Sequence, residues 1–208
     1  MFLTLKEYKL FKYLFLILGY VLSTNLAFAD GHEAAEVAVA DPAEISFVFN
    51  TLLFCIGGFL VMWMAAGFTM LEAGLVRGKN TVVICIKNLG LFSIAGLAYY
   101  LIGYNLMYAG VDGGYFGSIS IWSSGVGTAD DLVGQGYSPA SDWFFQMVFV
   151  ATTASIVSGA LAERILIYPF FAFIVVLTAI LYPISGSWQW GGGWLSEMGF
   201  SDFAGSTI

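Results

Sequence analysis

Ten residues near the C-terminal end, SGSWQWGGGW at 185–194, combine three tryptophans with four glycines and carry no charge. The face of an indole ring attracts cations, at about 0.5–2 kcal/mol per contact and more where water is excluded. Glycine has no side chain and adopts conformations closed to other residues, so it leaves a neighbouring ring uncovered. The stretch therefore has the chemistry to hold a small cation, and anchoring at a membrane interface is the alternative.

The rest of the chain offers no competing chemistry. It contains no nucleophile elbow, no phosphate-binding loop and no metal-ligand spacing. No apolar stretch contains an ionisable residue in its interior, which argues against a proton relay or a voltage sensor. We therefore predict no enzyme activity, no catalytic residue, no metal, no cofactor and no nucleic-acid partner.

The composition predicts a membrane protein. Of the 208 residues, 59% are hydrophobic and 10% are charged, whereas soluble domains carry about 25% charged residues. Four charge-free stretches reach the roughly 20 residues that a membrane-spanning helix needs. They lie at residues 45–71, 88–111, 143–162 and 165 to about 186.

The first 29 residues have the pattern of a secretory signal. Lys6, Lys9 and Lys12 precede a short apolar run, and the small residues AFA occupy 27–29. An uncleaved extra helix is the alternative, and the shortness of the apolar run argues against it. Residues 30–44 then form an acidic tail outside the cytoplasm.

Charge asymmetry orients the spans. Arg77, Lys79, Lys87 and Arg164 are the basic residues after position 29, and all lie in the two loops that share one side. The positive-inside rule assigns that side to the cytoplasm. On the opposite side lie eleven of the thirteen acidic residues after position 29, a face that concentrates small cations.

The third span carries small residues at helical spacing. Ala151, Ser155 and Gly159 are four residues apart, a pattern that lets helix backbones approach closely. Thr152 and Thr153 can bond to carbonyls of their own helix. We therefore expect this helix to lie inside the bundle.

Three motifs resemble the ammonium transporter family (Amt/Mep/Rh): GFTMLEAGLVRGKN at 67–80, FFQMVFVATTASIVSGALAERI at 144–165, and WGGGW followed by DFAGST within 190–207. The resemblance runs from about residue 45 to the end. It implies an all-α polytopic fold, with residues 45–208 as the first half of an eleven-helix inverted repeat. That half comprises spans one to four and the start of a fifth helix at Asp202.

The resemblance also assigns roles. Trp190 matches the tryptophan of an outer recruitment site for ammonium, whereas interfacial anchoring is favoured for Trp188 and Trp194. Phe149 matches the phenylalanine that lines this site and forms part of the gate beneath it. Phe145 matches a second aromatic residue of the vestibule. Tyr182 and Asp202 match supporting residues, and for Asp202 a helix-capping role is expected, with donors near Ala204 and Gly205.

Glu163 and Arg164, in GALAERI, are expected to hold helix ends and loops together. The resemblance further implies inward passage of ammonia, with or without a proton, across the inner membrane of a bacterium. It implies contact with membrane lipid, a homotrimer, and a PII-type regulatory protein on the cytoplasmic side. An ammonium sensor on the same fold and an Rh-like channel for ammonia or carbon dioxide are the alternatives, and the tryptophan of WGGG favours the Amt branch.

In the family, a pore histidine follows DFAGST by a few residues, and this sequence stops at Ile208. We therefore expect residues 1–208 to represent the first half of a transporter, whose pore-facing surfaces lack their partners. The isolated 208-residue chain is predicted neither to conduct nor to form stable trimers. Ammonium-dependent current from this chain in liposomes would contradict the prediction.

Overall fold

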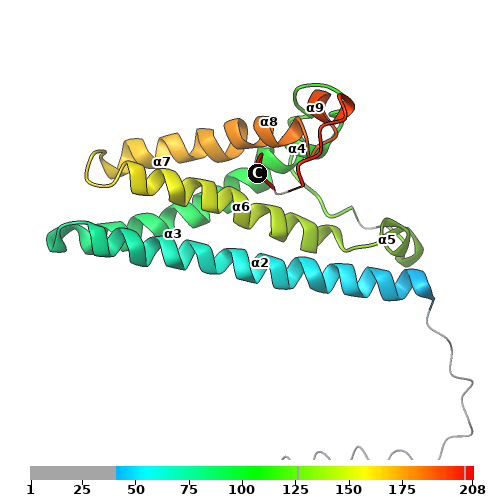
Figure 1. The fold of residues 1–208 in the computed structure, drawn as a ribbon, viewed down its shortest axis with the longest axis horizontal. Coiled ribbons are helices and arrows are strands. Elements are labelled where there is room, and N and C mark those ends of the chain that lie inside the picture. The colour runs from blue at the N-terminus through cyan, green and yellow to red at the C-terminus, as the bar shows by residue number, and fades with distance from the viewer. Residues whose placement is uncertain (1–40, 126, 204) are drawn as a thin grey trace, which may run out of the picture. The chain divides into compact units, whose positions relative to one another are not determined.

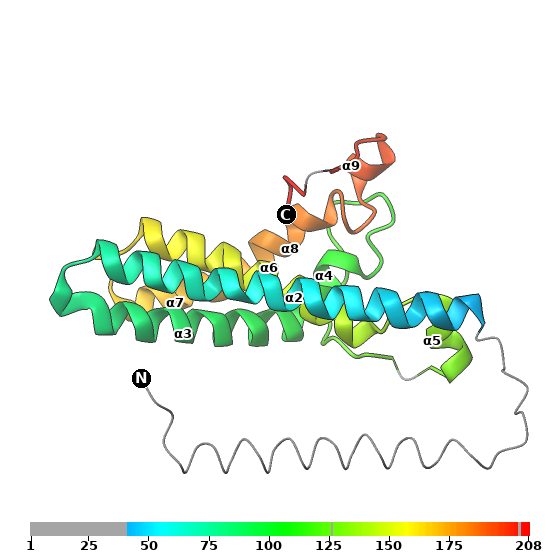
Figure 2. The same cartoon turned by 60° about the horizontal axis from the view of Figure 1, so that its bottom comes forward.

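Within the part of the chain that the structure describes, four helices are long and apolar enough to cross a membrane. The computed structural model describes residues 41–125, 127–203 and 205–208. The first and third spans are α2 (Pro42–Leu75) and α6 (Pro139–Ala160), which run side by side in Figures 1 and 2. The described residues contain helices and no strand, so the expected all-α fold is confirmed. The predicted signal at 1–29 and most of the acidic tail lie outside the described residues.

The other two spans are composite. The second, Gly78–Tyr108, joins η1 (Gly78–Asn80), α3 (Thr81–Ala98), η2 (Tyr99–Gly103) and α4 (Tyr104–Tyr108). The fourth, Ile167–Ser187, joins α7 (Ile167–Val176), η3 (Leu177–Leu181) and α8 (Tyr182–Ser187). Two short helices, α5 (Ala129–Gln135) and α9 (Trp194–Glu197), complete the described fold.

The first span is longer than residues 45–71. Asp41 caps α2 by accepting a hydrogen bond of 3.1 Å from the Ala43 N–H, and Pro42 occupies the first helical position. Both residue types favour helix starts. At the other end α2 continues to Leu75, so Glu72 lies within the helix.

The second span begins ten residues before position 88. The turn at Gly78–Asn80 leads directly into α3, which contains Lys87 with a buried side chain. The prediction that no span contains an ionisable residue was therefore wrong. A hydropathy pattern ends a span at the first charge, whereas the backbone continues its helical hydrogen bonds past a charge that finds a partner.

Both composite spans contain one π-helical turn, and the two turns pack together. In the fourth span Pro183 lacks an N–H, and the Tyr182 N–H bonds to the carbonyl of Leu177, five residues back. In the second span Gly103 permits the contact, since a Cβ there would lie 3.0 Å from the Thr178 carbonyl oxygen. The last segments of the two spans, α4 and α8, also pack against each other.

Helix α6 lies at the centre of the bundle. It packs against α2 and α3, and its residues Ala151, Ala154 and Ser155 are at most 1% exposed. Thr152 and Thr153 donate to the carbonyls of Val148 and Phe149. The expectation of a buried third span with self-satisfied threonines is confirmed.

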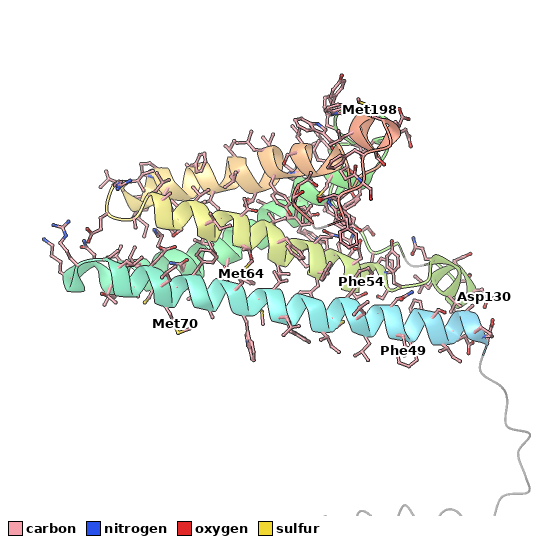
Figure 3. The ribbon with its side chains drawn as sticks, in the orientation of Figure 1. Phe49, Phe54, Met64, Met70, Asp130 and Met198 are labelled. Carbon is pink, nitrogen blue, oxygen red and sulfur yellow. The ribbon has the colours of Figure 1, made fainter. Side chains whose placement is uncertain are left out.

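The outer surface of α2 is apolar and uncovered in the described chain. In Figure 3, Phe49 and Met70 project from α2 away from the other helices, and they are 65% and 71% exposed. Trp63 is 75% exposed on the same helix. Such a surface fits a helix surrounded by lipid or by further helices.

Two glycines of α2 provide a test of this packing. A Cβ at Gly58 would lie 2.4 Å from the ring of Phe144, whereas a Cβ at Gly67 would meet nothing within 4 Å. Gly58→Ala is expected to destabilise the bundle by about 1–3 kcal/mol through overpacking. Gly67→Ala shares the gain in helix propensity without the clash. Thermal unfolding in detergent should rank Gly58→Ala below Gly67→Ala, and equal midpoints would refute the packing described.

Candidate functional site

The tryptophan–glycine stretch folds back onto the loop that follows α4. Trp188 donates its indole N–H to the Tyr115 carbonyl at 3.0 Å. Glycines 191 and 193 are required by close approach, since a Cβ at these positions would lie 2.0 Å and 2.6 Å from the carbonyl oxygens of Met107 and Ser187. Only Gly192, at φ +74°, is required by conformation. The glycines thus bring the backbone into contact, which fixes the position of Trp190.

Trp190 presents a ring with one tethered edge and a free face. Its indole N–H lies 3.2 Å from Asp202 Oδ2 and 3.1 Å from Thr207 Oγ1. The residue is 44% exposed, and among the described aromatic contacts none involves its ring. A ring held at its N–H beside a carboxylate can offer its face to a cation.

Asp202 gathers donors from the segment that follows it. Its Oδ1 accepts from the backbone N–H and hydroxyl of Ser206, at 2.7 and 2.9 Å. Its Oδ2 accepts from the Thr207 N–H at 2.8 Å and from the Thr207 hydroxyl. The expected helix-capping role is not confirmed, because the donors are Ser206 and Thr207 and the described residues 201–203 and 205–208 include no helical residue. The fifth helix predicted to start at Asp202 is therefore not seen in them.

These contacts keep Asp202 ionised. The Thr207 hydroxyl, followed by the Thr207 N–H and the donors of Ser206, lowers the pKa of Asp202 well below the ordinary range, although burial opposes the shift. The carboxylate therefore remains negative beside Trp190 at every physiological pH. Thr207 and Ser206 were missed as site residues because a hydroxyl one turn after an aspartate is a weak signal in sequence.

Phe145 and Phe149 form an edge-to-face pair on α6, with centroids 5.1 Å apart. Phe145 also contacts Phe54 of α2, at 5.3 Å, and lies over Gly57. Figure 3 shows Phe54 on the side of α2 that faces α6. Phe145 therefore packs between helices, and the described contacts do not join it to Trp190.

Phe149 belongs to the cluster that contains Tyr182. Phe149 is half-buried and packs against this cluster, and Tyr182 is 6% exposed. The Tyr182 hydroxyl is buried without a hydrogen-bond partner. Ile208, next to Thr207, packs against the same cluster. Chain continuity thus places the Trp190–Asp202 group beside the Phe149–Tyr182 group.

A second polar site lies at the other end of the helices. Glu72 of α2 and Lys87 of α3 form a buried ion pair, with 3.3 Å between Lys87 Nζ and Glu72 Oε2. Ser158 and Asn88 donate to the same oxygen, at 2.8 and 3.2 Å. The Lys87 ammonium also contacts the Ser158 carbonyl and lies 4.9 Å from the centre of the Phe170 ring. Continuation of the helical pattern past Leu71 and before Asn88 is the signal that could have revealed this site.

At the same end Glu163 joins the two loops, as expected. Its carboxylate accepts from the Arg77 backbone and guanidinium and from the Asn80 amide. These contacts, that of Asn80 foremost, lower the pKa of Glu163. Arg164, in the turn after α6, donates to the carbonyl of Ala160 at the end of that helix. On the opposite side, the predicted acidic surface includes Asp202 and Asp142, which are both buried, and Asp142 accepts from Tyr104 and from Gln146.

The chain belongs to the ammonium transporter family, whose family model matches residues 52–208. Members of this family are transporters rather than enzymes, and the four spans make the protein a multi-pass membrane protein. Trp190 and the buried Asp202 both lie within the matched residues.

Three comparisons give the extent of the likeness. A Synechocystis protein named provisionally as an ammonium transporter is 44% identical over 193 residues, which cover 91% of this chain and 42% of the relative. The ammonium transporter Amt2 of Archaeoglobus fulgidus is 41% identical, over 84% of this chain and 37% of its own. A solved structure called Sensor Amt Protein matches with a TM-score of 0.70 and 34% identity, over 78% of this chain and 41% of its own. The chain thus spans about two fifths of the length of these proteins.

Asp202→Asn tests the electrostatics of the outer site. Both carboxylate oxygens of Asp202 accept hydrogen bonds. In the variant, the amide NH2 group replaces one of these oxygens and faces other donors, so the variant is expected to be less stable than the wild type at pH 7. Because the pKa of Asp202 is lowered in the native state, the greater stability of the wild type is fully present above the ordinary aspartate pKa of about 3.9. It is lost as the pH falls through the native pKa. The measurement is thermal unfolding from pH 7 down to about pH 2, and the gap between the two proteins should begin to narrow below about pH 4.

Asp112→Asn is the matched control, since Asp112 is exposed and has φ +38°, a conformation that asparagine tolerates. The control should follow the wild type throughout. A gap between wild type and Asp202→Asn that does not narrow at low pH would contradict the assignment of an ionised Asp202.

Proposed function

We propose that the complete protein recruits ammonium at the face of Trp190 and passes ammonia inward across the membrane, with or without a proton. The observation that carries the proposal is the half-exposed indole tethered by its N–H to the ionised Asp202. The membership of the chain in the ammonium transporter family supports it.

The recruitment step follows from charge and ring chemistry. A cation over the indole face gains the ring's quadrupole attraction. The carboxylate of Asp202, which accepts the indole N–H, adds negative electrostatic potential next to the ring. Ammonium exchanges its hydration shell for such contacts more readily than sodium does, because its N–H groups can still donate hydrogen bonds. Trp190 with Asp202 thus selects a cation that is able to donate.

The passage step requires the ion to lose its charge before it enters an apolar path. Phe149 packs against the buried cluster that Ile208 also contacts, and it is the proposed gate. Phe145 supports it by packing edge-to-face. Tyr182 supports the gate from behind. Moving a charge past such rings without a counter-charge is costly, which favours conduction of ammonia.

The proposed orientation places Trp190 outside and the loops that contain Arg77 and Glu163 in the cytoplasm, at the inner membrane of a bacterium. The basic residues at the α2–α3 and α6–α7 turns support it. We further propose a homotrimer embedded in lipid, with a PII-type protein binding at the cytoplasmic face. The uncovered apolar surface of α2 supports contact with lipid or with further subunits.

An ammonium sensor on the same fold is the second candidate, and the structural match to a protein called Sensor Amt Protein favours it. The same recruitment site would then bind the ion in order to signal. A sensor is expected to bind ammonium and to show no net uptake, whereas a transporter shows both. Uptake of labelled methylammonium therefore separates the two.

Trp190→Leu, in the protein expressed from the complete open reading frame, tests the recruitment site. Loss of the indole removes about 0.5–2 kcal/mol of cation–π interaction. The apparent affinity for methylammonium should therefore weaken about 2- to 30-fold. Uptake by cells or liposomes over a range of concentrations provides the measurement.

Trp63→Leu is the matched control, because Trp63 is 75% exposed on the outer surface of α2. This variant should retain wild-type affinity. Unchanged uptake in Trp190→Leu, with the protein folded and present at wild-type level, would eliminate the proposed recruitment site.

A further inference from the structure

The buried carboxylate of Glu72 uses one oxygen and leaves the other without a donor. Oε2 receives Lys87, Ser158 and Asn88, whereas Oε1 has no hydrogen-bond partner and is buried. Glu72 as a whole is 3% exposed. Burying an acceptor without a donor is costly, and more so when the group is charged, so this oxygen indicates a missing donor.

Glu72 lines a cavity of about 380 Å³ between the ends of α2 and α6. Its Oε1 lies beside Gly159, 3.8 Å from the position that a Cβ would occupy, and Gly159 lines the same cavity. The wall is apolar apart from Glu72 and Glu163. Both oxygens of Glu163 already accept from Arg77, and one also from Asn80. Glu72 therefore offers the one unused carboxylate oxygen of this wall.

The cavity lies at one end of a face of α6, and the aromatic pair Phe145 and Phe149 lies on the same face towards the start of the helix. Residues spaced by three or four positions share one face of a helix. Five such residues run from the outer end to the cavity, and the structure leaves each of them half-buried or exposed: Phe145, Phe149, Thr153, Ile156 and Ala160. The only hydroxyl of this stripe, that of Thr153, donates to the Phe149 carbonyl. A stripe of mainly apolar side chains, the α6 track, thus runs along the helix from Phe149 to Ile156 and Ala160, which line the cavity.

We infer that Glu72 forms a second binding site for ammonium or ammonia, at the end of the α6 track opposite Trp190. Oε1 accepts an N–H of the ligand, while Lys87, Ser158 and Asn88 hold Oε2 and fix the carboxylate. This inference rests on the proposed function, because it takes the α6 track as the path of ammonia. The ligand class is a small nitrogen donor, since only a donor satisfies the free oxygen.

The two sites differ in their chemistry. The outer site holds a cation by an aromatic face and the charge of Asp202. The inner site pairs its carboxylate with Lys87, so the local net charge is zero and the free oxygen acts by hydrogen bonding. Such a site accepts a hydrogen bond from ammonia that arrives through an apolar path and releases the ammonia to the cytoplasm, where water supplies the proton that converts it to ammonium.

Glu72→Gln is the test, in the protein expressed from the complete open reading frame and reconstituted with known orientation in liposomes. The probe is labelled methylammonium, added at either side of the membrane. A hydrogen bond to a charged group is worth about 1.5–3 kcal/mol. The variant should therefore lose about tenfold or more in apparent affinity for probe added at the Glu72 side. Affinity for probe added at the Trp190 side should stay within twofold of wild type.

Glu163→Gln is the matched control, because Glu163 lines the same cavity and its oxygens are already occupied. It should retain wild-type affinity from both sides. Trp190→Leu should show the reverse of Glu72→Gln, with its loss confined to the Trp190 side. If Trp190→Leu loses affinity and Glu72→Gln does not, the proposed function stands and the inner site is refuted. If Trp190→Leu has no effect, the proposed function fails whatever Glu72→Gln does.

A second variant covers a failure of Glu72→Gln to fold, since it leaves Lys87 buried without its counter-charge. Glu72→Gln with Lys87→Gln removes both charges and keeps hydrogen-bonding groups at both positions. The folded double variant should show the same one-sided loss. Wild-type affinity at the Glu72 side in a folded variant overturns the inference. If neither variant folds, the pair serves structure alone, and the inference is overturned as well.

Discussion

The close approach of α6 to its neighbours is the constraint on which both polar sites depend. Ala151, Ala154 and Ser155 let the helix lie against α2 and α3 with almost no exposed surface. The same helix positions Phe149 against the cluster that contains Tyr182, and it positions Ser158 to donate to Glu72. A larger residue on the small face would move both ends together, because a helix transmits such a shift along its length.

The two sites use carboxylates in opposite ways. Asp202 receives donors on both oxygens, which fixes its charge and holds the Trp190 edge while the ring face stays free. Glu72 receives its donors on one oxygen, and the other has no hydrogen-bond partner in a residue that lines a largely apolar cavity. A fully satisfied carboxylate acts through its field, whereas a half-satisfied one acts through its free lone pairs. The same functional group thus suits the recruitment proposed at one end and the hydrogen bonding proposed at the other.

Most of the architecture could be predicted from the sequence, because the bilayer imposes simple requirements on span length and on the location of charge. The four spans, the buried α6 and the clamp at Glu163 followed from this. The span boundaries did not, since Asp41 extends α2 and a helical turn precedes α3. Lys87 was placed in a loop because a hydropathy pattern treats a charge as the end of a span. The pattern contains no information on Glu72 of the neighbouring helix, which pairs with Lys87. The roles assigned to Trp190, Phe149, Phe145 and Tyr182 came from family resemblance, and they remain proposals.

By itself the sequence determined the membrane class, the family and the identity of the exposed tryptophan, because composition and local motifs are properties of neighbouring residues. Only the tertiary structure decided which groups meet. It brought Ser206 and Thr207 to Asp202, brought Lys87 to Glu72, and separated Phe145 from Trp190 by packing it on α2. It also showed that Gly191 and Gly193 serve close contact rather than freedom to turn. These pairings depend on helix register and backbone distance, which are set by packing across the whole bundle.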